Sequence, residues 1–78
     1  MKANEVAVAM DALGHEARLE IFRALVRAGR SGLTVSEIQR RLGGMPRSTL
    51  AHHLQKLVMA RLSLQEKVGA SVVTRANF

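Results

Sequence analysis

Cysteine is absent from the sequence, as are tyrosine and tryptophan, and phenylalanine occurs only twice. Without cysteine the chain has no disulfide bond, no thiolate zinc site and no cysteine nucleophile, which is compatible with a reducing cytoplasm. The shortage of aromatic side chains weighs against recognition of single-stranded RNA, because such recognition relies on stacking bases against aromatic rings. The composition therefore excludes sites built on cysteine and disfavours recognition of single-stranded RNA.

Long apolar runs are also missing. No stretch approaches the ~20 apolar residues that a membrane-spanning helix needs. The N-terminus carries Lys2 but no apolar core of the kind found in signal peptides. We therefore expect a cytoplasmic protein. The 78 residues suffice for a single domain, 1–78, and the hydrophobic content of 47% is enough for a core.

Acidic side chains are scarce in the second half of the chain. The net charge is +6, and residues 1–37 are balanced between basic and acidic groups. The whole excess lies in residues 38–78, where Glu66 alone opposes Arg40, Arg41, Arg47, Lys56, Arg61, Lys67 and Arg75. Such asymmetry indicates a polyanionic partner, although a solvated basic surface without a partner would have the same composition.

Apolar spacing predicts four helices, near residues 5–13, 15–29, 35–42 and 46–61. The first can be capped by Asn4, and its apolar stripe consists of Val6, Met10 and Leu13. The apolar face of the second comprises Leu19, Ile21, Phe22, Leu25 and Val26. His15 at its start is interpreted as a boundary or packing residue rather than a ligand.

Capping signals define the third and fourth helices. Thr34 and Glu37 have the spacing of a capping box, and Gly43-Gly44 must end the helix that this box opens. Pro46 suits the first turn of the next helix, where its missing N–H is not needed. The expected buried stripe of that last helix is Leu50, Leu54, Leu57 and Val58.

After Leu62 the period changes from 3.6 to about 2, since Leu62 and Leu64 alternate with Ser63 and Gln65. Gly69-Ala70 marks a turn, and β-branched residues follow it. A two-stranded antiparallel hairpin is therefore predicted near residues 63–76. It must pack on the helices, because an isolated hairpin is only marginally stable.

Two short helices joined by a glycine break, then a basic hairpin, predict a mainly α fold of the winged helix-turn-helix class. The helix-turn-helix would span about residues 34–61, and the hairpin would be its wing. In this motif the second helix enters the major groove of double-stranded DNA. Its exposed side offers hydrogen-bonding groups and a flat alanine, namely Arg47, Ser48, Thr49, Ala51, His52, Gln55 and Lys56, while Arg40 and Lys67 would meet phosphates.

Four segments resemble the ArsR-type (arsenic-repressor-like) winged helix-turn-helix regulators of prokaryotes: "LGHEARLEIFRAL", "LTVSEIQRRLG", "STLAHHLQKL" and "RLSLQEKVGASVV". The resemblance implies DNA-facing positions at Arg47, Ser48, Ala51 and His52, with Lys67 in the wing. Many metal-sensing members carry cysteines where this chain has Thr34 and Ser36, so that metal site is absent. The family usually continues past the wing into a dimerisation helix, whereas this sequence ends at Phe78.

The adjacent His52 and His53 are not expected to share a metal ion, because consecutive helical residues diverge by ~100° and chelating pairs normally sit four apart. No supporting nucleophile or acid accompanies them, so we expect neither catalysis nor a cofactor. His52 is interpreted as a DNA contact and His53 as a packing or orienting residue. Two surface histidines without a role are the alternative.

The preferred function is a sequence-specific, double-stranded DNA-binding transcriptional regulator, a repressor, acting as a homodimer through Val6, Met10 and Leu13. The main alternative is a helical protein-interaction module whose basic face is incidental. RNA binding is a third reading. Salt distinguishes the first two, because a protein that makes several phosphate contacts loses affinity steeply as salt rises.

Overall fold

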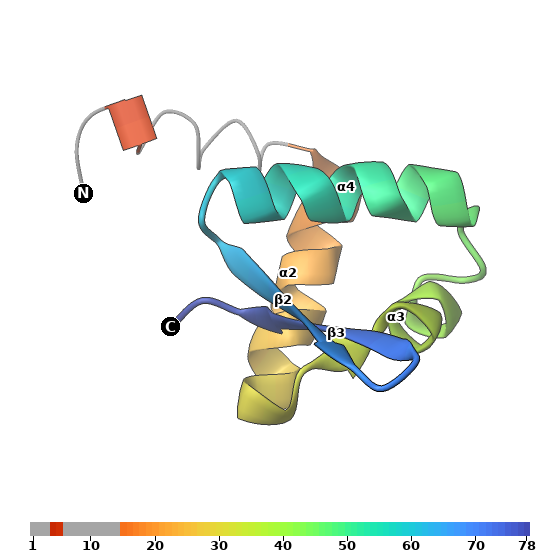
Figure 1. The fold of residues 1–78 in the computed structure, drawn as a ribbon. Helices are drawn as coiled ribbons and strands as arrows, with labels where there is room; N and C mark the ends of the chain where they lie inside the picture. The colour runs from red at the N-terminus through yellow and green to blue at the C-terminus, as the bar shows by residue number, and fades with distance from the viewer. Residues whose placement is uncertain (1–3, 6–14) are drawn as a thin grey trace.

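The computed structural model describes residues 4–5 and 15–78 (Figure 1). Within them the order of elements is α2 (Glu16–Ala28), the 3-10 turn η1 (Gly29–Ser31), β1 (Leu33–Thr34), α3 (Val35–Arg41), α4 (Arg47–Met59), β2 (Ser63–Val68) and β3 (Ser71–Ala76). Asn4 and Glu5 are helical, but the rest of the predicted first helix, with Val6, Met10 and Leu13, lies outside the described residues. The predicted winged helix-turn-helix class is confirmed.

The capping box acts as the sequence predicts, whereas Pro46 is the N-cap of α4 and lies just before its first turn. The Thr34 hydroxyl accepts a hydrogen bond of 3.1 Å from the Glu37 backbone N–H, and the Glu37 carboxylate accepts one of 3.0 Å from the Thr34 N–H. The bond from the Thr34 backbone favours the ionised carboxylate and is the largest cause of the lowered pKa of Glu37, followed by the Thr34 side chain. The start of α3 is thereby fixed.

The sheet has three strands in the order β1-β3-β2, all antiparallel, where the sequence predicted two. The hairpin of β2 and β3 has the predicted position, and Leu33 and Thr34 add a short strand to the far side of β3. A strand of only two residues is too short to produce an alternating pattern that the sequence would reveal. Because β1 directly precedes α3, it joins the wing to the helix-turn-helix.

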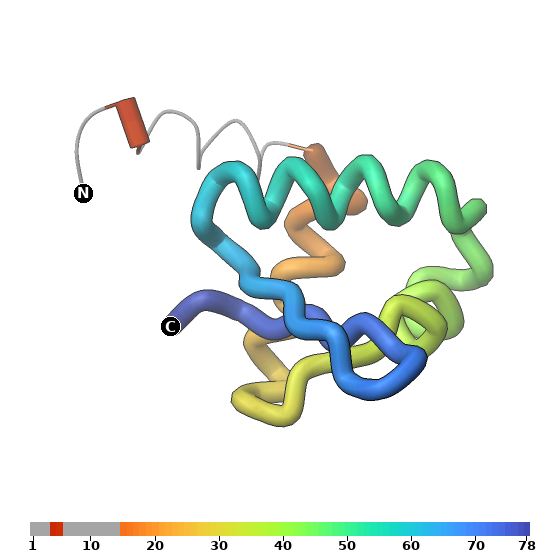
Figure 2. Tube along the Cα trace, in the orientation of Figure 1, coloured from red at the N-terminus to blue at the C-terminus, as the bar shows by residue number. Residues whose placement is uncertain are grey.

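Side chains from α2, β1, α3, α4 and β3 meet in one core. Leucine, isoleucine and alanine dominate it, with the residues Ile21, Ala24, Leu25, Leu33, Ile38, Leu50, Leu54, Leu57 and Ala76. Figure 2 shows α2 passing behind the hairpin, and α4 running along one end of α2. The core therefore lies where α2, α4 and the inner face of the sheet meet.

Two predicted core residues are exposed instead: Val26 at 43% and Val58 at 36%. Each lies about 100° around its helix from the leucine before it, which places it at the rim of the buried stripe. The buried stripe of α4 instead includes His53, and Ala60 extends it just past the end of the helix. The prediction that Val26 and Val58 lie in the core was wrong, because the buried stripes of α2 and α4 are centred one residue earlier in the sequence.

The alternation in β2 also has the opposite phase to a hydrophobic-inward strand. Ser63 is buried and Leu64 is 49% exposed. Leu62 lies in the turn that follows α4, where its N–H donates to the Leu57 carbonyl, so the strand begins at Ser63. Ser63 pairs with Ala76 and Gln65 with Thr74, and this face of the hairpin turns toward the helices.

Gly32 allows β1 to approach β3 closely. Its φ is 66°, and a Cβ placed there would lie 2.6 Å from the Thr74 carbonyl oxygen and 2.9 Å from a Val73 methyl. Neither the backbone conformation nor the space admits another residue.

Gly32→Ala is therefore expected to lower the free energy of unfolding by about 2–5 kcal/mol, because backbone strain and the clash with β3 add together. Gly69→Ala is the matched control: its φ is also positive, at 61°, but a Cβ there meets nothing within 4 Å. The control should lose only about 1–2 kcal/mol. Equal losses in urea unfolding would contradict the close approach.

Candidate nucleic-acid interface

The N-terminal half of α4 divides into a buried and an exposed side. Leu50, His53, Leu54 and Leu57 are buried against the body of the domain. Every residue that the sequence analysis assigned to the DNA-facing side is exposed: Arg47, Ser48, Thr49, Ala51, His52, Gln55 and Lys56. Of these, Lys56 lies in the last turn of α4 and so stands apart from the N-terminal group.

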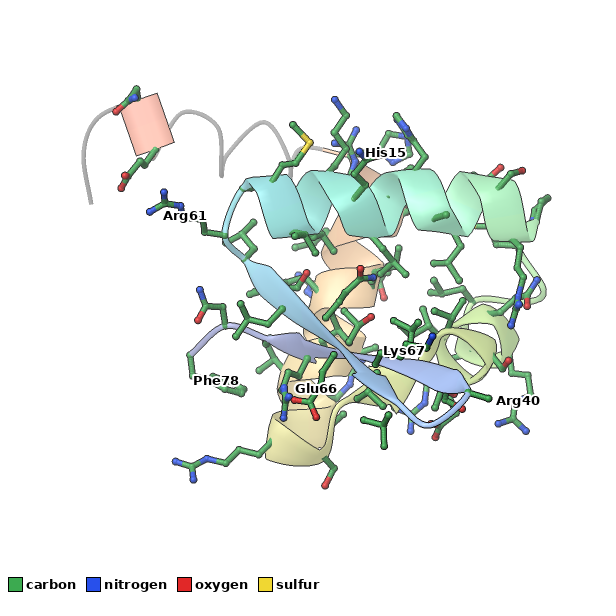
Figure 3. All side chains as sticks on the ribbon, viewed as in Figure 1. His15, Arg40, Arg61, Glu66, Lys67 and Phe78 are labelled. Carbon is green, nitrogen blue, oxygen red and sulfur yellow. The ribbon has the colours of Figure 1, made fainter. Side chains whose placement is uncertain are left out.

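The exposed side of α4 carries no acidic group, because its sequence RSTLAHHLQKLVM contains none. The nearest carboxylate along the chain, Glu66, forms an ion pair with Arg75 across the hairpin. Figure 3 shows Arg40 at the end of the molecule where the wing turns, and Arg61 and Phe78 at the opposite end. Arg40 and Lys67 are both exposed, so the cations predicted to meet phosphates are accessible.

Arg47 is held by a residue that the sequence analysis did not assign to the site. Its guanidinium donates a hydrogen bond of 2.9 Å to the Ser36 hydroxyl, in the first turn of α3. A hollow of about 390 Å³ lies beside this bond, between α3 and the turn of the wing, and its lining includes Thr34, Ser36, Arg47 and Ser71. In the sequence, Ser36 attracted notice only as a position without a thiolate, and no local pattern links it to Arg47, eleven residues away.

A second hollow separates α4 from the wing. It measures about 290 Å³ and is lined by Ala51, Gln55 and Val58 of α4, Gln65 of β2, and Val35, Leu54 and Val72. Ala51, the flat alanine of the exposed side, forms part of the α4 wall of this hollow. Gln65 faces Gln55 across this space and also donates a bond of 3.4 Å to the Thr74 hydroxyl. Its position follows from the strand phase that the sequence analysis missed.

The turn of the motif fixes the entry of α4. The Gln39 side chain donates a bond of 2.8 Å to the Met45 carbonyl, and the Gly44 N–H donates one of 2.9 Å to the Gln39 carbonyl. Gly43 and Gly44 both have a positive φ, at 76° and 81°. Because glycine adopts this backbone without strain, the chain can leave α3 and begin α4 within five residues.

The two adjacent histidines separate as the helix geometry predicts: His52 is exposed and His53 is 6% exposed. His15 begins α2, where its Nδ1 accepts a hydrogen bond from the Ala17 N–H. Among the described residues, no three His, Cys, Asp or Glu side chains form a group that could hold a metal ion. Nor is any helix of the described part both long and apolar enough to cross a membrane.

A family model described as a helix-turn-helix domain matches residues 13–62, so the chain belongs to this family. Solved structures of other proteins are also similar to this chain. HlyU from Vibrio cholerae N16961 is 28% identical with a TM-score of 0.85, and the match covers 100% of this chain and 83% of that one. The search of curated proteins found no match.

An ArsR-like transcriptional regulator from Rhodococcus sp. RHA1 is 34% identical, with a TM-score of 0.79. That match covers 94% of this chain and 65% of the Rhodococcus chain. The family model and these neighbours confirm the resemblance to ArsR-type regulators that the sequence carries. The chain is a DNA-binding transcriptional regulator of the ArsR type.

Proposed function

We propose that the chain recognises a specific sequence in double-stranded DNA, with α4 in the major groove, and represses transcription as a homodimer in the cytoplasm. The observation that carries this proposal is the exposed N-terminal half of α4. It offers hydrogen-bonding and cationic side chains without any carboxylate, and it stands between α3 and the wing. A helical protein-interaction module is the second candidate, and it would not need a helix face that carries cationic side chains and no carboxylate.

The proposed contacts are of two kinds. We assign Arg47, Ser48, Ala51 and His52 to base edges, because the first turns of the second helix come nearest to the groove floor. Gln55 is an intermediate case, since it shares the exposed side but lies a turn further from the groove floor. The residues assigned to phosphates are Thr49, Arg40, Lys56 and Lys67. Lys67 lies on the wing, so it would approach the DNA from the other side of the hollow between α4 and β2. The proposed phosphate contacts thus surround a helix face whose side chains can hydrogen-bond to bases. This arrangement supports recognition of a DNA sequence rather than charge attraction alone.

Arg47→Ala should cost about 1–3 kcal/mol of binding free energy and relax the base preference at one position of each half-site. His52→Ala should behave in the same way. Lys67→Ala should weaken binding to all sequences alike and reduce the salt slope by about one per subunit, since it removes a phosphate contact. Fluorescence anisotropy of a labelled duplex at several salt concentrations measures both effects.

Arg30→Ala supplies the control, because Arg30 is an exposed cation on η1, away from α4 and from the turn of the wing (Figure 1). It should leave affinity and salt slope unchanged. If Arg30→Ala and Lys67→Ala weakened binding equally, a diffuse charge effect would replace the proposed contacts. Binding without salt dependence would favour the protein-interaction module.

Homodimerisation is proposed through the stripe Val6, Met10 and Leu13. A domain this small has little core in which to bury a further apolar stripe, and helix-turn-helix proteins commonly read paired half-sites as two-fold dimers. Repression is inferred from the family resemblance, since a bound dimer would occlude the DNA beneath it.

Sedimentation equilibrium should give a mass twice the 8.5 kDa of one chain. Met10→Glu should give a monomer, because it places a charge in the apolar stripe. Val68→Glu, a change of the same kind at an exposed position of the wing, should remain a dimer. A monomeric parent protein at tens of micromolar would contradict the proposed dimer.

A further inference from the structure

Three histidines and an arginine gather where the start of α2 meets α4. His15 caps α2, and its ring lies 4.7 Å from that of His53, centroid to centroid. His52 lies 6.0 Å from His53 on the outer side of α4. Figure 3 shows His15 close against α4. Arg18 follows His15 in the first turn of α2, so this contact joins the recognition helix to the helix behind it.

Two polar atoms in this contact have no partner among the described residues. The Nδ1 atom of His53 and the Nε atom of Arg18 are both buried, and neither forms a hydrogen bond within residues 4–5 and 15–78. His53 itself is 6% exposed, on the same side of α4 as Leu50, Leu54 and Leu57. A neutral imidazole can remain in such a position at modest cost, whereas an imidazolium would need a partner for its additional N–H and for its charge.

The groups that act on His53 would oppose that charge. From α2 these are His15 and Arg18, and from α4 itself His52. No carboxylate of the described residues is among them. Burial is the largest cause of the lowered pKa of His53, followed by His15, Arg18 and His52, which act in the same direction.

The sign of the pH dependence follows from this lowered pKa. Since the folded protein binds the His53 proton less readily than the unfolded chain, whose value is near 6.5, protonation favours unfolding. The stabilising contribution is fully present above pH 6.5 and is lost as the pH falls through the pKa of the folded state.

We propose that neutral His53 positions α4 on α2, and that its protonation loosens this packing and lowers DNA affinity in mildly acidic medium. The effect on DNA rests on the proposed function, whereas the effect on folding does not. His53 acts through the position of α4 and does not itself touch DNA. The two adjacent histidines therefore have different roles: His52 faces the DNA, and His53 holds α4 in position.

Urea unfolding between pH 5 and pH 8 tests the folding effect. Below pH 6.5 the unfolding constant of the parent protein should rise more steeply than that of His53→Leu, by up to about tenfold per pH unit, the limit for one proton. The stability of the His53→Leu protein relative to the parent protein should therefore be greater at pH 5 than at pH 8. A merely structural loss would lower stability equally at every pH.

Two further variants make the test decisive. His53→Gln is neutral and polar, so it serves if leucine is not accommodated, and it should also lose the pH dependence. His52→Gln removes the exposed neighbour and should keep the pH dependence of the parent. A parental slope in both His53 variants, or loss of the slope in His52→Gln, would overturn the assignment to His53.

DNA binding is measured with one duplex at constant ionic strength, in the His52→Gln protein and in the double variant His52→Gln/His53→Leu. The His52→Gln background removes the other imidazole of α4, which lies on the exposed DNA-facing side, so that only the residue at position 53 differs between the two proteins. Affinity should fall with acid in the single variant and stay level in the double variant. A parallel fall in both overturns the link between His53 and DNA binding. If the parent protein bound no DNA at any pH, the proposed function would be overturned and the link with it, while the unfolding data would still decide the folding effect.

Discussion

The packing of α4 across α2 and the sheet is the constraint on which the rest of the structure depends. Leu50, Leu54 and Leu57 are almost completely removed from solvent, and each such side chain contributes about 1.5–3 kcal/mol. Because these leucines repeat with the period of the helix, their burial also determines which side of α4 faces outward. The side that remains holds Arg47, Ser48, His52 and Gln55, so the core and the proposed DNA surface are two consequences of one pattern.

The other elements hold α4 at its two ends. At its start, the Gln39 side chain and the paired glycines bring the chain out of α3 in a fixed direction. At its end, Arg61 adopts a positive φ of 61°, and the Arg61 and Leu62 carbonyls accept hydrogen bonds from Asn77 after β3. The wing therefore has a defined position relative to α4. Two separate parts of the chain can then address one DNA duplex.

Most of this arrangement could be predicted from the sequence because its signals are local. The capping box at Thr34, the glycine break and the period of the leucines each act within about one turn of helix, and each has the predicted effect. The pairing of β1 with β3 and the bond from Arg47 to Ser36 could not be predicted. Both join residues distant in the sequence, and neither leaves a periodic trace.

His53 shows the same limit in a different way. Its neighbour in sequence, His52, suggested a shared role, and helix geometry alone separated the two side chains. That His53 meets His15 and Arg18 depends on how α2 crosses α4, which no spacing within either helix encodes. The buried stripe of α4 includes His53, whereas Val58 is 36% exposed at its rim. Functional side chains in this fold are thus predictable on the exposed face and much less so at helix crossings.

The central claim, that α4 reads a sequence in double-stranded DNA, is tested most directly by selecting bound duplexes from a random pool at increasing salt. The account predicts enrichment of a two-fold symmetric site, with half-sites about 10 base pairs apart centre to centre, and recovery that falls steeply as salt rises. A pool that remained random after repeated selection, although the protein was folded and retained DNA at low salt, would contradict it.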